Sequence, residues 1–185
     1  MKKILLFLLF ITTFITYSVD WNDTPYWYDM QYLPRVEEYL KPGDVILLSP
    51  ANFLKTGHMM LVNKEKKLMD FPGMEVGFRE TLAEALTWQD RSFLVLRHKD
   101  MNEKLIDEML NYIDENFLNS GYMIIFDTEN TYDKTYCSLF IYNVFNKFIT
   151  DPDKKLPKRG IIVHPRHFIS YGHAFNVINF DEILK

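Results

Sequence analysis

Cys137 is the only cysteine in this 185-residue chain. It stands where a polar loop meets the apolar run Leu139–Phe145. If that run is a helix, the thiol lies at the helix N-terminus, where unpaired backbone N–H groups favour the thiolate. The thiolate is the nucleophilic form of cysteine, so the position predicts a nucleophile. The alternative is a small buried side chain without chemistry.

A histidine and an aspartate upstream could complete a reactive group. His58 opens the apolar segment His58–Asn63, and Asp70 lies in the segment Lys67–Phe71, after a charged turn. The pattern predicts a hairpin that brings the two side chains together if their register matches. A cysteine hydrolase needs an imidazole near its thiolate and a polar group that orients the imidazole. The alternative for His58 is a structural histidine on an apolar strand.

Three further residues surround the cysteine in the sequence and are candidates for contacting the substrate or the oxyanion: Tyr132, Tyr136 and Ser138. A first-turn N–H group can also donate to the oxyanion. The two tyrosines could equally be core aromatics.

His164, His167 and His173 lie close together in the sequence, and imidazoles suit zinc. No neighbouring cysteine or dense acidic cluster completes a site, and the His164-Pro165 step predicts a turn. We therefore expect no metal and no organic cofactor.

The elements that position these residues follow from hydrophobic patterning and from turn and cap residues. Strands are predicted at Val45–Leu48, His58–Asn63, Lys67–Phe71, Ser92–Arg97, Ile161–Val163 and Ala174–Ile178. Helical turns are predicted at Pro34–Leu40, a short helix at Thr81–Leu86, an outer helix at Asn102–Phe117 and a buried central helix from Cys137 to about Phe148. Together they predict an α+β fold.

The N-terminus predicts export. Lys2 and Lys3 precede an uncharged, mostly apolar stretch, and small residues follow it, so residues 1–18 predict a secretory signal peptide. The apolar stretch is short for a membrane span, although an uncleaved anchor is the alternative. We expect a periplasmic or extracellular protein that begins near Val19.

The remaining chain predicts an aromatic-rich segment at 19–40, lying across one domain at 41–185. Removing the two signal lysines from the 21 basic residues leaves 19 against 25 acidic, a formal charge of −6. Nucleic acid is therefore not expected as a partner.

The order of four segments is similar to that in the circularly permuted, papain-like hydrolases of the NlpC type, and in particular to the branch called YaeF/YiiX. The resemblance covers roughly Lys41 to Phe180, and the segments that carry it are Pro42–Leu47, Gly57–Val62, Leu68–Gly73 and Tyr136–Ser138.

The resemblance implies an antiparallel sheet packed on a central helix that starts at the catalytic cysteine. It implies Cys137 as nucleophile, His58 as general base and Asp70 as orienting residue. The chain departs from the family at Met60, where a small residue is common, and Asp70 has a short side chain for its role. The implied activity is hydrolysis of an amide in a cell-wall peptide or a lipid, at the cell wall or a membrane surface.

Two rival functions stay open. A thiol acyltransferase or lipid hydrolase of the same fold, resembling the lecithin:retinol type, would usually have a second histidine in place of Asp70. A catalytically silent binding domain would keep the fold with an unreactive cysteine.

Overall fold

The computed structural model describes residues 21, 24, 26–51, 56–124, 132–158 and 162–185. The predicted signal peptide at 1–18 lies outside these residues. Within them, no helix has the length and apolar character needed to cross a membrane.

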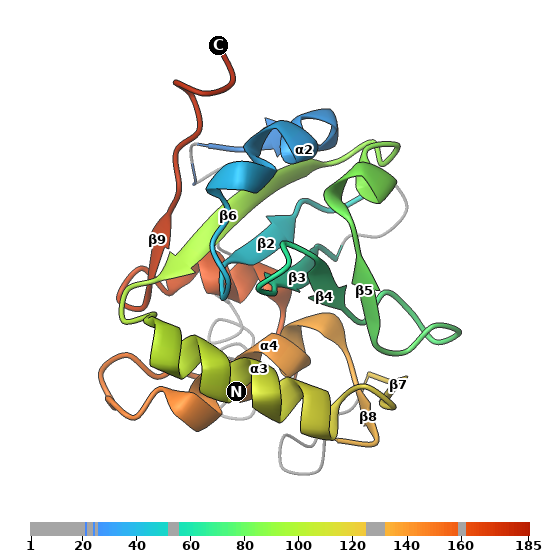
Figure 1. Ribbon diagram of the computed structural model, residues 1–185, viewed down its shortest axis with the longest axis vertical. Helices are drawn as coiled ribbons and strands as arrows, with labels where there is room; N and C mark the ends of the chain where they lie inside the picture. The colour runs from blue at the N-terminus through green and yellow to red at the C-terminus, as the bar shows by residue number, and fades with distance from the viewer. Residues whose placement is uncertain (1–20, 22–23, 25, 52–55, 125–131, 159–161) are drawn as a thin grey trace, which may run out of the picture.

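An antiparallel sheet forms the centre of the described part of the chain (Figure 1). Its strands run in the order β1-β6-β2-β3-β4-β5, and β9 also pairs with β6. Their bounds are β1 Tyr28–Asp29, β2 Val45–Leu48, β3 His58–Val62, β4 Leu68–Asp70, β5 Arg79–Thr81, β6 Ser92–His98 and β9 Phe175–Val177. The predicted β3–β4 hairpin is confirmed, with Leu61 opposite Met69.

The alternation of side chains along β2 divides the core into two layers. Val45 and Leu47 belong to the layer shared with helices α3 (Glu103–Asn116) and α4 (Cys137–Phe148), whereas Ile46 and Leu48 belong to the layer on the other face. That second face is covered by η2 (Met30–Tyr32) and α2 (Leu33–Val36), which η3 (Glu37–Tyr39) follows (Figure 1). Trp21 and Trp27 instead pack against the layer that contains α3 and α4.

Helix α4 runs through the core below the sheet and begins at Cys137, as predicted. Tyr136 precedes it in an extended conformation (φ −139°, ψ 162°), so the chain enters the helix at the cysteine. Seven of its residues are buried, which is the composition expected of a helix surrounded by protein. Helix α3 lies on the outer side of α4, and Asn102 caps it by accepting a hydrogen bond from the Leu105 N–H.

The Pro-Gly-Asp turn before β2 has a structural role. Gly43 has a positive φ of 86°, which glycine adopts readily. Asp44 is almost fully buried and accepts hydrogen bonds from the Lys41 N–H at 2.8 Å and from Arg97 Nε and Nη2 at 2.7 Å each. Because Arg97 belongs to β6, this ion pair fixes the turn to the neighbouring strand.

Two predicted elements were wrong. Thr81 ends strand β5, and only a 3₁₀ turn, η4 (Ala83–Leu86), follows it. Residues 162–163 form no strand, because the Val163 N–H donates to the Tyr136 hydroxyl and its carbonyl accepts from Ser138 Oγ. Ile161 lies outside the described residues.

The sequence pattern also missed several short elements, among them β1, η2, β5, the parallel pair β7 (Gly121–Tyr122) and β8 (Lys134–Thr135), and the 3₁₀ helix η5 (Pro165–Ser170).

Candidate active site

His58 is the first residue of β3 and lies opposite Leu48 of β2. The preceding glycine allows this close packing, because a Cβ at Gly57 would lie 2.6 Å from the Leu48 carbonyl oxygen and 2.3 Å from a ring atom of Trp21. The Trp21 ring also packs against His164, with 6.3 Å between ring centroids. A residue of the N-terminal segment thus supports the wall beside His58.

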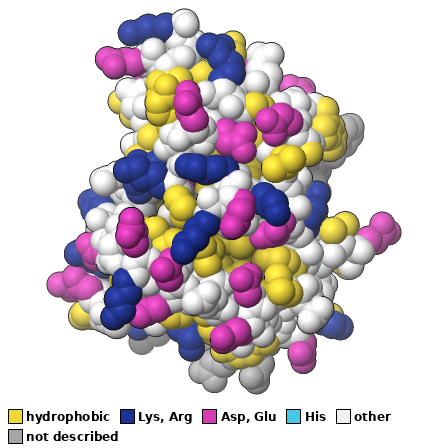
Figure 2. Space-filling model, viewed as in Figure 1, with side chains coloured by type: hydrophobic (Ala, Val, Ile, Leu, Met, Phe, Trp, Pro, Cys, Tyr) yellow, Lys and Arg dark blue, Asp and Glu magenta, His cyan; other side chains and the backbone are white. Residues whose placement is uncertain are grey.

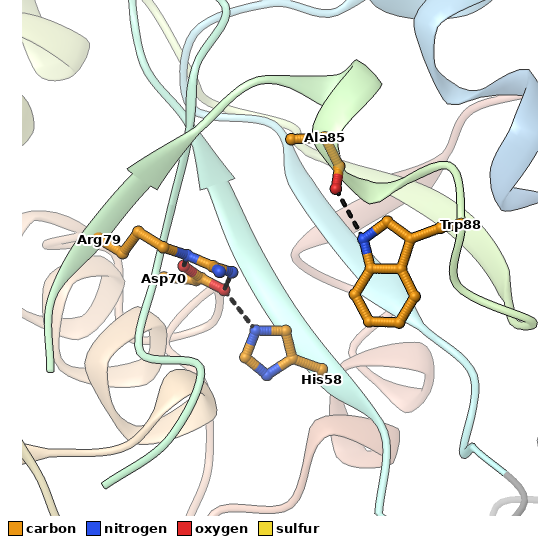
Figure 3. Close-up of polar contacts among 5 residues, drawn as sticks. All are labelled: His58, Asp70, Arg79, Ala85 and Trp88. Carbon is orange, nitrogen blue, oxygen red and sulfur yellow. Dashed lines mark hydrogen bonds and ion pairs between the residues drawn. The ribbon is translucent and has the colours of Figure 1, made fainter. Parts of the chain in front are cut away.

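The predicted hydrogen bond between His58 and Asp70 is present. His58 Nε2 lies 2.7 Å from Asp70 Oδ2, and the aspartate side chain is fully buried (Figure 3). Arg79, from the neighbouring strand β5, donates to both carboxylate oxygens, with Nε 3.0 Å from Oδ1 and Nη2 2.8 Å from Oδ2. A bidentate arginine fixes the plane of a carboxylate. Asp70 is therefore oriented on one side and orients His58 on the other.

Cys137 begins α4, which packs against β3, and it lines the same cleft as His58. Each side chain shifts the pKa of the other, and since Asp70 is bonded to Nε2, Nδ1 is the ring nitrogen left for an interaction with the sulfur. The backbone N–H groups of Met59 and Ser138 also lower the pKa of the thiol. The nucleophile candidate, the imidazole and the carboxylate thus lie together.

The electrostatics of this pair favour the charged forms. Burial alone would raise the pKa of the Cys137 thiol, but the charge and hydrogen bond of His58 and the two backbone donors outweigh burial, so the pKa is lowered. Burial likewise opposes the imidazolium, but the Cys137 thiolate and then Asp70 raise the pKa of His58 to about 9. The arrangement supports a thiolate–imidazolium pair near neutral pH.

The residues around the cysteine differ in what they can contact. Tyr136 and Ser138 line the same cleft as Cys137. The Tyr136 hydroxyl accepts from the Val163 N–H at 3.0 Å, and burial raises its pKa to about 12, so it stays protonated and can donate. Ser138 Oγ donates to the Val163 carbonyl at 2.7 Å, which leaves its backbone N–H as the group near the sulfur.

Tyr132 does not line the cleft, which corrects the expectation that it contacts the substrate. Its hydroxyl accepts a hydrogen bond from Tyr112 at 3.0 Å, and its ring packs against Tyr112 and Phe117. Proximity in sequence was misleading because Tyr132 packs toward helix α3.

A cleft of about 1090 Å³ opens over Cys137 and His58. Trp88 lies on its rim with 80% of its surface exposed, and its indole Nε1 donates to the Ala85 carbonyl at 2.9 Å (Figure 3). Ile124 and Ile162 line the cleft as well, and both side chains are exposed. A ligand in the cleft would therefore meet both Cys137 and exposed apolar side chains.

Sequence reasoning missed Arg79, Trp88 and Arg91, which all line the cleft. Arg79 lies opposite Asp70 in the β4–β5 pairing, but Arg79-Glu80-Thr81 has no apolar alternation to predict that strand. The positions of Trp88 and Arg91 depend on how the loop before β6 folds, and no local sequence pattern predicts the conformation of this loop.

The three C-terminal histidines do not form a metal-binding group. His164 Nδ1 accepts from the Arg166 N–H at 3.2 Å, His167 Nδ1 accepts from the His164 N–H at 3.4 Å, and His173 contacts the Lys155 carbonyl. No cluster of three or more possible metal ligands occurs among the residues that the structure describes.

Comparison with known proteins gives a likeness of fold. No protein-family model and no curated protein matches the chain. Among solved structures, metalloprotein yiiX from Escherichia coli O157:H7 is similar, with a TM-score of 0.50 and 13% identity over 75% of this chain and 96% of that chain. The α+β architecture with its antiparallel sheet is consistent with a yiiX-like fold.

Proposed function

We propose that the chain is an exported cysteine hydrolase that cleaves an amide bond through Cys137, His58 and Asp70. The observation that carries this proposal is that Cys137 and His58 line one cleft while His58 Nε2 lies 2.7 Å from Asp70 Oδ2. A nucleophile, a base and an orienting group in this sequence of contacts are the minimum that acyl transfer by a thiol requires. The cleft gives a substrate access to them.

The order of the elements supports a circularly permuted papain-like arrangement of the NlpC type. The histidine strand β3 precedes the cysteine helix α4 in the chain, and the sheet packs on that helix. A yiiX-like fold agrees with this arrangement.

The reaction we propose has two steps. The Cys137 thiolate attacks the amide carbonyl carbon, and the tetrahedral intermediate collapses as His58 gives its proton to the leaving amine. The product is a thioester on Cys137. Neutral His58 then takes a proton from water, the hydroxide attacks the thioester, and the released thiolate and imidazolium restore the starting pair.

Stabilisation of the oxyanion falls to donors around the start of α4. The backbone N–H groups of the first turn of α4 carry partial positive charge and can donate to an oxyanion formed beside Cys137. The protonated Tyr136 hydroxyl lines the same cleft, and within the described part of the chain its hydrogen has no acceptor. We assign Tyr136 as the side-chain donor.

The substrate we propose is a peptide or lipid amide met outside the cytoplasmic membrane, at the cell wall or a membrane surface. The signal-like sequence at residues 1–18 supports export. The metalloprotein description belongs to the yiiX structure, and the mechanism proposed for this chain has no step that uses a metal.

The test is to trap the acyl-enzyme. Wild-type protein is incubated with cell-wall peptides or with lipid amides, quenched in acid and analysed by intact and peptide mass spectrometry. An acyl mass on the Cys137 peptide, absent from Cys137→Ser, supports the proposal. Transfer of the acyl group to an added amine or alcohol in preference to water would favour the acyltransferase. Tight binding without any adduct or product would favour the silent binding domain.

A further inference from the structure

The cleft over Cys137 has an unusual charge distribution. On the face shown in Figure 2, acidic and basic side chains are interspersed. Among the described residues that line the cleft there is no aspartate or glutamate, whereas three arginines line it: Arg79, Arg91 and Arg166. This contrasts with the formal net charge of −4 for the whole chain.

Most of the other charges at the site compensate one another. Arg79 is paired with the Asp70 carboxylate, and the His58 imidazolium is paired with the Cys137 thiolate. Two guanidinium groups, Arg91 and Arg166, then remain without an acidic partner among the described residues.

Arg91 is held in place at the start of β6. Its Nε donates to the Ser49 carbonyl at 2.7 Å, and its backbone carbonyl accepts from the Met30 N–H at 3.1 Å. The side chain is half-buried and lines the same cleft as Cys137. The adjacent Asp90 is exposed and does not line the cleft. The guanidinium Nη groups are thus available to a ligand in the cleft.

Arg166 lines the cleft from the C-terminal part of the chain, where it is the second residue of η5. Its backbone N–H donates to His164 Nδ1, and its side-chain Nε is buried without a hydrogen-bond partner among the described residues. A buried donor with no partner costs free energy, which a ligand that accepts its hydrogen bond would recover.

We propose that Arg91 and Arg166 form an anion-binding subsite of the cleft, so that the substrate carries a carboxylate or phosphate group near its scissile carbonyl. A guanidinium matches both anions because its planar donors bind two oxygens at once. This inference rests on the proposed function, since it names the class of substrate that the same cysteine would attack.

The first experiment compares two alkylating reagents of nearly equal size, iodoacetate and iodoacetamide. Their rates with Cys137 are measured for wild type, Arg91→Gln and Arg166→Gln, and each is divided by its rate with N-acetylcysteine. Arg35→Gln is the matched control, because Arg35 is exposed on α2 and stacks over Tyr32 away from the cleft. Circular dichroism checks that each variant is folded.

We expect Arg91→Gln to lower the corrected iodoacetate rate by about tenfold, the value of one charged hydrogen bond, while the iodoacetamide rate changes little. Arg166→Gln should also lower the corrected iodoacetate rate. Arg91→Lys should keep part of the wild-type preference for iodoacetate over iodoacetamide, and Arg35→Gln should match wild type. An iodoacetate-to-iodoacetamide ratio that is the same in all five proteins would overturn the subsite and leave the activated cysteine intact.

The second experiment does not depend on a reactive cysteine. Arginine Nε–H signals are followed by NMR while inorganic phosphate or acetate is added at constant ionic strength. Saturable shifts of Arg91 and Arg166, but not of Arg35, are expected with at least one of the two anions, and the tighter one identifies the group as phosphate or carboxylate. Equal, non-saturating shifts of all three arginines would overturn the proposal. An unreactive thiol together with saturable binding would refute the hydrolase and keep the subsite.

Discussion

Arg79 holds both oxygens of the Asp70 carboxylate, at 3.0 and 2.8 Å, from the strand next to it. The second of these oxygens, Oδ2, also lies 2.7 Å from His58 Nε2. The carboxylate is fully buried, so its orientation depends on these two neighbours. In the proposed mechanism, Arg79 is a positioning residue that acts on Cys137 through Asp70 and His58.

Arg79→Gln should therefore slow turnover by about tenfold, because a mispositioned catalytic group loses part of its effect without being removed. The turnover of Arg79→Lys should lie between those of wild type and Arg79→Gln, since lysine keeps the charge but loses the bidentate geometry. The measurements are the turnover of a substrate identified by acyl-enzyme trapping and the rate of Cys137 alkylation at pH 6. Equal alkylation rates in all three proteins would contradict a positioning role for Arg79.

Asp70→Asn should reduce turnover by about a hundredfold or more while the fold stays intact, because an amide cannot stabilise the imidazolium as a carboxylate does. Asp70 is among the groups that raise the pKa of His58, so the His58 titration should move to lower pH in this variant. NMR of the imidazole reports the shift. An unchanged titration would mean that the contact is only structural.

Cys137→Ser should also lower the pKa of His58 from about 9, because among the causes that raise it the thiolate is the largest and serine stays uncharged. A pKa raised on folding stabilises the folded protein fully below the unfolded value and loses that contribution as pH rises through the folded value, whereas the lowered pKa of Cys137 gives a contribution that grows with pH. In wild type these two contributions oppose each other between the ordinary histidine and thiol ranges, because the pair holds one proton both when folded and when unfolded. NMR titration of the His58 imidazole in wild type and Cys137→Ser is therefore the measurement, and the same His58 pKa in both proteins would contradict the pairing.

Asp44→Asn tests the separation of scaffold from site. The substitution leaves Arg97 without its buried counter-charge, and we expect the free energy of unfolding to fall by about 3 kcal/mol. Because Asp44 lies at the turn before β2 and not in the cleft, the alkylation rate of the folded variant should match wild type. A large loss of Cys137 reactivity in fully folded Asp44→Asn would show that the turn also affects the geometry of the site.

Much of the scaffold could be predicted because its signals are local. β2 and β3 are apolar runs bounded by turn residues, and helix α4 begins at the predicted residue because a polar loop gives way there to an apolar run. The contact between His58 and Asp70 could be predicted because one short charged turn joins their strands.

The remaining features depend on contacts between distant segments. Arg79-Glu80-Thr81 becomes a strand only because β4 offers it a pairing edge. Val163, in an apolar run that predicts a strand, has both backbone groups bonded to side chains of the cysteine segment. The place of Arg91 in the cleft follows from the folded position of the loop before β6, which no periodicity encodes.

The most direct test of the central claim is the pH dependence of iodoacetamide labelling at Cys137 in wild type and in His58→Ala. The imidazolium is among the groups that lower the pKa of the thiol. Wild type should therefore label rapidly at mildly acidic pH, and His58→Ala should need a distinctly higher pH to reach the same rate. If both proteins titrate like an ordinary thiol, or if Cys137 reacts only after unfolding, Cys137 is not an activated nucleophile and the hydrolase proposal is contradicted.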